Sequence, residues 1–313
     1  MDFPPVRVRS MTARLLLAAL VPLLAAMAFP VSGNDGVLVL GRISDDPRHH
    51  YGQLKPLLDY VVPRMAEVGI VEGRILMASD ALQMQRYLRR GRVDWVTETP
   101  AMAVQLGRRV GARTLLATER GGVDLYHTVV FVREDSPVRT LADLRGRSLA
   151  LQRAASTSAY YAPAMSILGA GLNLEPLLSP SDSPDPANIG YLFAGSEHNI
   201  LAWVRVGLSD AGAFSNLDWQ AFGLDRPMSP PRLRVIHRTQ HFPRAVELVR
   251  ADLPEPVAER LREVLLGAAD DPEAGPALRS FFDTTGFKRI DRETERLLVA
   301  LGDGVARVRE ELE

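Results

Sequence analysis

Short apolar runs alternate along the chain with stretches in which apolar residues recur every three or four positions. The apolar runs predict strands at 37–43, 74–78, 93–97, 114–118, 127–133, 148–151, 189–193, 211–214 and 233–237. The helical spacing predicts helices at 51–65, 83–90, 101–109, 159–168, 199–206, 254–266 and 292–312, with no strand between the last two. This alternation is typical of an α/β fold with mostly parallel sheets flanked by helices.

Two turn-rich segments divide this pattern. Residues 134–137 form a polar turn after a strong strand, and residues 225–231 precede the last predicted strand. We therefore predict two lobes. The outer lobe comprises residues 34–132 and 237–313, and the middle lobe, residues 133–236, is inserted between its two halves.

Residues 1–33 have the features of a secretory signal peptide. Three arginines precede an apolar run at 15–29, and small residues at 26–28 or 31–33 offer a cleavage site. A membrane-spanning helix needs about 20 apolar residues, whereas this run is shorter and contains Pro22. We therefore expect export to the periplasm, with no stable membrane insertion after cleavage.

Composition excludes several classes of function. The net charge is −1, and the sequence has no concentrated tract of basic residues of the kind that nucleic-acid binding requires. The chain has no cysteine, so neither disulfides nor thiol chemistry is possible. The HExxH, GxSxG, GxxxxGK[ST] and GxGxxG motifs are absent. We expect neither a cofactor nor a metal ion.

Three consecutive hydroxyl side chains, Ser156, Thr157 and Ser158, follow the predicted strand at 148–151 and begin a helical run. The first turn of a helix has free N–H groups, and its dipole favours an anion. The cluster therefore suits an oxyanion. The structural alternative is helix capping by Ser156 or Thr157, which requires only one hydroxyl.

A second polar group, Thr97, Glu98 and Thr99, ends the predicted strand at 93–97, directly before Pro100. Ligands of open α/β sheets bind beyond the carboxyl ends of the strands. Glu98 can accept a hydrogen bond from a protonated phosphate oxygen or an ammonium group, so it would select the ligand. Thr99 is also a candidate helix N-cap.

Further candidate ligand-binding side chains lie at other strand ends. Glu197, His198 and Asn199 follow the strand at 189–193, where His198 could donate to an oxyanion, although Ser196 and Asn199 could simply start the helix. Tyr126 precedes the strand at 127–133, and a buried structural tyrosine is the alternative. The remaining candidates, after the first strand, are Ser44 and Tyr51.

In order and spacing, these segments resemble the phosphate, phosphite and phosphonate substrate-binding proteins of ABC transporters. The matching segments are 43–47 with Tyr51, 93–99, Tyr126, 143–146, 156–158, 196–199 and 210–213. The resemblance implies a type II periplasmic binding protein fold whose two lobes close on a ligand in the cleft between them. It also implies that Ser156, Thr157 and Ser158 hold the phosphate or phosphonate group and that Tyr126 lines the cleft.

The sequence departs from this family in the part of the site that reads the ligand's substituent. Ala159 replaces the glycine of a Ser-Thr-Ser-Gly motif, and Glu197 precedes His198 and Asn199 where the family carries Gly-Ser-His-Asp.

The resemblance implies a monomeric, non-enzymatic receptor that delivers an oxyanion to an ABC transporter permease. Two alternatives use the same fold. A periplasmic sensing subunit would present the closed lobes to a membrane histidine kinase, and an enzyme would use Glu98, Glu197 and His198 as an acid/base set.

Overall fold

The computed structural model describes Met1, residues 36–225 and residues 232–313. The predicted signal peptide, apart from Met1, lies outside these residues. Within the described ranges, no helix combines the length and apolar character needed to cross a bilayer.

In the described residues, the first sheet has six strands, ordered β14-β4-β13-β3-β1-β2. Strand β1 runs parallel to β2 and β3, whereas β13 runs antiparallel to β3 and β4, and β14 antiparallel to β4. The strands are β1 (Val37–Ile43), β2 (Glu72–Ala78), β3 (Trp95–Glu98), β4 (Arg113–Arg120), β13 (Ala245–Val249) and β14 (Thr284–Lys288).

The second sheet, counted over the same residues, also has six strands, ordered β11-β6-β10-β7-β9-β8. Strand β6 runs antiparallel to both its neighbours, and the other pairs are parallel. The strands are β6 (Thr128–Arg133), β7 (Ser148–Leu151), β8 (Asn173–Pro176), β9 (Asn188–Phe193), β10 (Ala211–Ser215) and β11 (Leu233–Arg238). Two short strands, β5 (Leu125–Tyr126) and β12 (Phe242–Pro243), pair with each other.

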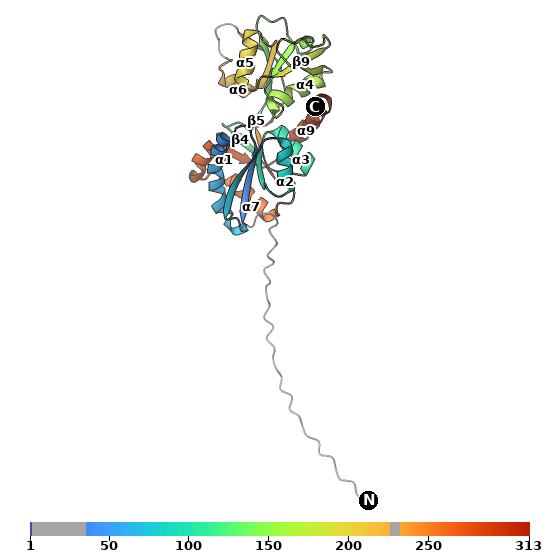
Figure 1. The fold of residues 1–313 in the computed structure, drawn as a ribbon. Coiled ribbons are helices and arrows are strands. Elements are labelled where there is room, and N and C mark those ends of the chain that lie inside the picture. Colours follow the sequence, from blue (N-terminus) through green and yellow to red (C-terminus); the bar gives the residue numbers. More distant parts are fainter. Residues whose placement is uncertain (2–35, 226–231) are drawn as a thin grey trace. The chain divides into compact units, whose positions relative to one another are not determined.

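Helices surround both sheets. Figure 1 shows α1, α2, α3 and α7 around the first sheet, and α4, α5 and α6 around the second. The helices are α1 (Pro47–Val61), α2 (Ala81–Arg89), α3 (Pro100–Val110), α4 (Ala162–Gly169), α5 (Glu197–Val206), α6 (Asn216–Ala221), α7 (Glu255–Gly267), α8 (Gly275–Ser280) and α9 (Arg292–Leu312). The shorter turns are η1 (Val62–Val68), η2 (Leu141–Leu144), η3 (Thr157–Tyr161) and η4 (Pro272–Ala274).

Local sequence fixes where several helices begin. The Asp46 carboxylate accepts a hydrogen bond from the His49 N–H, and Pro47 occupies the first helical position of α1. The Asp291 carboxylate caps α9 in the same way, at 2.7 Å from the Thr294 N–H. Each cap satisfies a backbone donor that has no partner within the helix.

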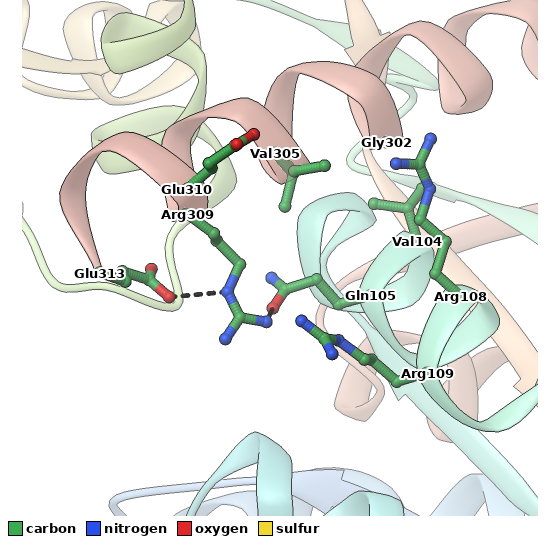
Figure 2. Close-up of a pocket in the computed structure, with 10 residues that line it drawn as sticks. Val104, Gln105, Arg108, Arg109, Gly302, Val305, Arg309, Glu310 and Glu313 are labelled. Atoms are coloured by element: carbon green, nitrogen blue, oxygen red, sulfur yellow. Dashed lines mark hydrogen bonds and ion pairs between the residues drawn. The ribbon is translucent and has the colours of Figure 1, made fainter.

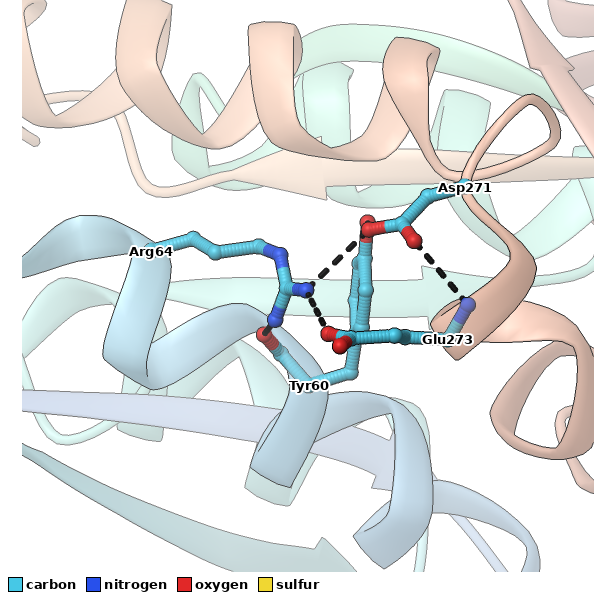
Figure 3. A network of polar contacts seen from close by, with 4 residues as sticks. All are labelled: Tyr60, Arg64, Asp271 and Glu273. Atoms are coloured by element: carbon cyan, nitrogen blue, oxygen red, sulfur yellow. Dashed lines mark hydrogen bonds and ion pairs between the residues drawn. The ribbon is translucent and has the colours of Figure 1, made fainter.

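A polar network ties α1 and η1 to the η4 turn (Figure 3). The Asp271 carboxylate accepts from the Tyr60 hydroxyl at 2.8 Å and pairs with Arg64 at 3.1 Å. Arg64 also pairs with Glu273 at 2.8 Å and stacks over the Tyr60 ring. These side chains are partly solvated, so we assign the network a positioning role and at most about 1 kcal/mol per ion pair.

The structure confirms the predicted α/β class, but the sheets are mixed rather than mostly parallel: in the first sheet β13 and β14 add three antiparallel pairs to two parallel ones. The structure also corrects the element list. A strand, β14, lies between the last two long helices, where none was predicted. It is an edge strand with a weak apolar pattern. Strand β13 was also missed because Glu247 interrupts its apolar run.

The inserted middle lobe stays a prediction. Its proposed limits, residues 133 and 236, fall within β6 and β11, both of which belong to the second sheet.

Candidate functional site

The three hydroxyl residues 156–158 form the buried turn that opens η3. The Ser156 Oγ caps this turn by accepting from the Ala159 N–H at 3.0 Å. Thr157 is 1% exposed and Ser158 8% exposed. Capping by Ser156 is therefore real, but it occupies one hydroxyl oxygen of the three.

This turn contacts the polar segment that follows β3. The Ala101 N–H, in the first turn of α3, donates to Thr157 Oγ1 at 2.9 Å. The Thr99 hydroxyl donates to the Ala155 carbonyl at 3.4 Å and makes no capping bond to its own helix. Two strand ends from different sheets therefore place their polar side chains together.

Tyr126 adjoins the same turn. It is 4% exposed, and its ring packs edge-on against Phe242 at 4.5 Å between centroids. Burial raises the pKa of its phenol, while the Arg244 guanidinium and a hydrogen bond with Ser158 act in the opposite direction. The Ser158 carbonyl accepts from the Thr128 hydroxyl at 2.7 Å, which fixes the turn against β6.

Glu98 and Thr97 are buried and held by neighbouring strands. The Glu98 carboxylate accepts from the Ile43 N–H at 2.8 Å and from the Thr99 N–H at 3.1 Å. The Thr97 hydroxyl donates to Glu247 at 2.9 Å. Both residues therefore brace the strand ends.

Ser44 lies at the end of β1, where its Oγ is 2.6 Å from His50 Nδ1 and accepts from the Asp46 N–H. Tyr51, one residue beyond His50, is 48% exposed. The structure thus buries Ser44 in the turn that follows β1 and leaves Tyr51 at the surface.

The three residues predicted at 197–199 lie in different surroundings. Glu197 is partly buried, and its pKa is raised by burial and by the nearby Asp218 carboxylate. His198 is exposed and packs against Phe222. Asn199 is bonded within the turn, through its N–H to Ser196 Oγ and its amide to the Ala194 carbonyl.

A pair of arginines at the ends of β1 and β4 was not among the predicted site residues. The guanidinium carbons of Arg42 and Arg120 each lie 4.4 Å from the centroid of the Phe282 ring. Both guanidinium groups donate to Thr97. Arg42 donates to the Thr97 carbonyl oxygen at 3.3 Å, and Arg120 donates to the Thr97 hydroxyl oxygen at 3.5 Å.

A third arginine, Arg244, follows the short strand β12 and lies 5.0 Å above the Tyr126 ring. Burial and the positive charges of Arg42 and Arg244 lower the pKa of Arg120 to about 9. We call Arg42, Arg120 and Arg244 the arginine cluster. The sequence signal for these three arginines was their position at strand ends. The chain has so many arginines that this position alone did not distinguish them.

Glu247 is the buried carboxylate beside the arginine cluster, and it too was missed. It is 0% exposed and accepts from Trp95 Nε1 at 2.7 Å, Thr97 Oγ1 at 2.9 Å and Thr118 Oγ1 at 2.7 Å. Burial raises its pKa, while Arg120 and the three donors oppose that change. Its hydrogen bonds to neutral groups make it a structural anchor for three strands.

A cavity of about 490 Å³ lies elsewhere, between α3 and α9 (Figure 2). Its lining includes Arg309, which bonds Gln105 at 2.8 Å and pairs with Glu313 at 2.7 Å. Arg108, also in the lining, pairs with Asp303. Arg309 and Arg108, two of the three arginines in the lining, already have carboxylate partners, so this cavity is a weaker candidate for an anion than the strand ends.

Within the described ranges, no cluster of three His, Cys, Asp or Glu side chains could hold a metal ion. The polar groups at the strand ends are hydroxyls, backbone amides and guanidinium groups, which favour an anionic ligand.

A family profile described as "ABC transporter, phosphonate, periplasmic substrate-binding protein" matches residues 44–294. The chain belongs to this family. Members of this family are the substrate-binding components of transporters rather than enzymes.

Solved structures share the fold of this chain. The chain is 54% identical to XAC2383 from Xanthomonas citri bound to chloride ion, with a TM-score of 0.83, over 88% of this chain and 100% of that one. For XAC2383 bound to ATP the sequence identity is 52% and the TM-score 0.82, over 89% of this chain and 100% of that one. PhnD1 from Prochlorococcus marinus, in complex with methylphosphonate, shares the fold at 16% identity. The TM-score is 0.63, over 88% of this chain and 100% of that one.

Proposed function

We propose that this protein is the periplasmic solute-binding component of an ABC importer for phosphate, phosphite or a phosphonate. In this proposal the Ser156–Ser158 turn binds the oxyanion, and a hinge closes the two lobes on it. The observation that carries the proposal is the contact of this turn with Thr99, Ala101 and Tyr126.

The hydrogen-bond directions leave donors for a ligand. The oxygens of Ser156 and Thr157 each accept from a backbone N–H. A hydroxyl that accepts still has its own O–H to donate. Hydrogen bonds to a charged group contribute about 1.5–3 kcal/mol each, so a few of them support micromolar affinity, equivalent to about −8 kcal/mol.

The relatives support an anionic ligand. XAC2383 is described bound to chloride and to ATP, and PhnD1 bound to methylphosphonate. All three ligands are anions.

The test compares Ser156→Ala/Thr157→Val with Ser156→Ala/Thr157→Ser. The valine removes the oxygen that accepts from Ala101, whereas the serine keeps it. Calorimetry with phosphate, phosphite and methylphosphonate should show wild-type binding to at least one anion. The valine variant should lose at least about 150-fold in affinity, since two charge-assisted bonds of about 1.5 kcal/mol or more each are removed. The serine variant should lose less.

Thermal unfolding without ligand should show that both variants still fold. Undiminished affinity of the valine variant for every anion that the wild type binds would refute the assignment of this turn as the binding site.

A further inference from the structure

The arginine cluster lies beside the Ser156–Ser158 turn and contributes more positive charge than one small oxyanion needs. Arg42 and Arg120 share the Phe282 ring, and Arg244 stacks on Tyr126. Tyr126 in turn bonds Ser158. The cluster and the turn are therefore neighbours, joined through one phenol.

The three guanidinium groups are not in direct contact with a carboxylate of the described residues, and none of them forms an ion pair with one. The Nε atoms of Arg42, Arg120 and Arg244 are buried without any hydrogen-bond partner among the described residues. A buried donor left unsatisfied is unfavourable, and three like charges in a region of low dielectric repel each other.

The nearby carboxylates offset only part of this charge: the charges of Glu98 and Glu247 favour the charged form of Arg42, and Glu247 does the same for Arg120, but neither carboxylate pairs directly with a guanidinium group. Both Glu98 oxygens accept from backbone N–H groups, and Glu247 is bonded to one indole and two hydroxyls. Asp45 pairs with Arg153. His50, next to Arg42, has its pKa lowered to about 4 by burial and by that arginine, so it adds no charge at neutral pH.

We propose that the arginine cluster is a second anion subsite, so that the ligand carries two acidic groups. The Ser156–Ser158 turn holds one oxyanion, and the guanidinium groups hold a second phosphate, phosphonate or carboxylate. A guanidinium group can donate two parallel hydrogen bonds to two oxygens of such an acid. This inference rests on the proposed function, because it assumes that the turn binds the first oxyanion.

Matched pairs of ligands test the second subsite by calorimetry at constant ionic strength. Phosphate is compared with pyrophosphate, and methylphosphonate with phosphonoacetate. The wild type should prefer at least one two-headed ligand to its one-headed partner by at least about tenfold. The pair that shows the preference identifies the second group as a phosphate or a carboxylate.

Arg120→Gln and Arg244→Gln should each remove most of that preference, because they weaken the two-headed ligand by at least about tenfold more than phosphate or methylphosphonate. Ser156→Ala should weaken one-headed and two-headed ligands alike. Arg90→Gln, an exposed site on the first-sheet side, changes the net charge equally and should leave the preference intact. Thermal unfolding checks that each variant folds.

The failures are distinguishable. An arginine variant that weakens phosphate and pyrophosphate equally, or a wild type without any preference, would overturn the second subsite and leave the proposed function standing. A wild type that binds none of the probes would overturn both.

Discussion

His50, next to the arginine cluster, is held neutral by its surroundings. Burial, followed by the positive charges of Arg42 and His49, lowers its pKa from 6.5 to about 4. Between these two values the unfolded chain binds a proton on this ring that the folded protein does not. Stability is therefore lost as the pH falls from about 6.5 to about 4, and this contribution levels off below that window.

Replacing this ring should remove that part of the acid sensitivity. Because the ring is partly solvated, we expect the wild type to lose only about 1 kcal/mol more than His50→Gln between about pH 7 and about pH 4. Urea unfolding at both pH values measures the difference. His198→Gln, an exposed histidine on α5, is the control and should follow the wild type. Equal losses in wild type and His50→Gln would contradict the argument.

At this scale the sequence singled out the hydroxyl residues of the proposed site but not the arginine cluster. Ser156, Thr157 and Ser158 are conspicuous because three adjacent hydroxyls after a strand have few structural uses. Arg42 and Arg120 are single charges at the ends of apolar runs, and in isolation each is indistinguishable from a surface arginine. Only the placement of their two strands in one sheet, with the Phe282 ring in contact with both guanidinium groups, brings them together.

Among the elements, the turn before β14 carries backbone strain. Phe282 has a φ of 55° and Asp283 a φ of 53°, in the left-handed region that side chains disfavour. The Asp283 carbonyl accepts from the Gly121 N–H at 2.7 Å, next to Arg120. Strain of this kind persists where surrounding contacts fix the conformation, and here it places the Phe282 ring between two arginines.

A pair of variants separates the backbone from the ring. Phe282→Ala and Phe282→Gly both remove the aromatic contacts, but only glycine adopts this φ without a steric penalty. We expect the glycine variant to be more stable than the alanine variant by about 1 kcal/mol. Urea unfolding of the two proteins gives the difference directly. An alanine variant as stable as the glycine variant would show that the turn relaxes to an ordinary conformation.

Elements were predictable where the apolar pattern was uninterrupted. The predicted bounds of β1, β7 and α9 match the structure because each has a clear period and a clear end. Strand β13 was not predicted because this central strand carries Glu247, whose burial depends on three donors from other strands. That compensation is a tertiary property, and no local pattern reports it.

For the molecule as a whole, α9 connects the cores of the two sheets. Its Leu298 packs with Val39, Val96 and other residues of the first sheet. Its Leu301, Val305 and Val308 belong instead to the core that contains β7 and α4. A helix that completes two cores makes each of them depend on the other, so we expect the wild type to unfold in a single transition.

The double variant Leu301→Ala/Val305→Ala should uncouple the two cores. The truncations remove on the order of 4 kcal/mol from the second-sheet core, while Leu298 remains in place. In a Trp203→Phe/Trp219→Phe background, the fluorescence of Trp95 reports on the first sheet alone, and far-ultraviolet circular dichroism reports on both. The two urea curves should coincide before the truncations. After them, circular dichroism should show an earlier transition that Trp95 does not detect.

The exposed Val299, on the same helix, supplies the control for this experiment. Val299→Ala should change stability by less than about 0.5 kcal/mol and leave the two curves coincident. If the two curves still coincided in the truncated protein, shifted together to lower urea, the cores would be coupled through contacts other than α9. The bonds from Thr99 to Ala155 and from Ala101 to Thr157 would then be the next contacts to test, because they are polar links between the two sheets at the proposed site.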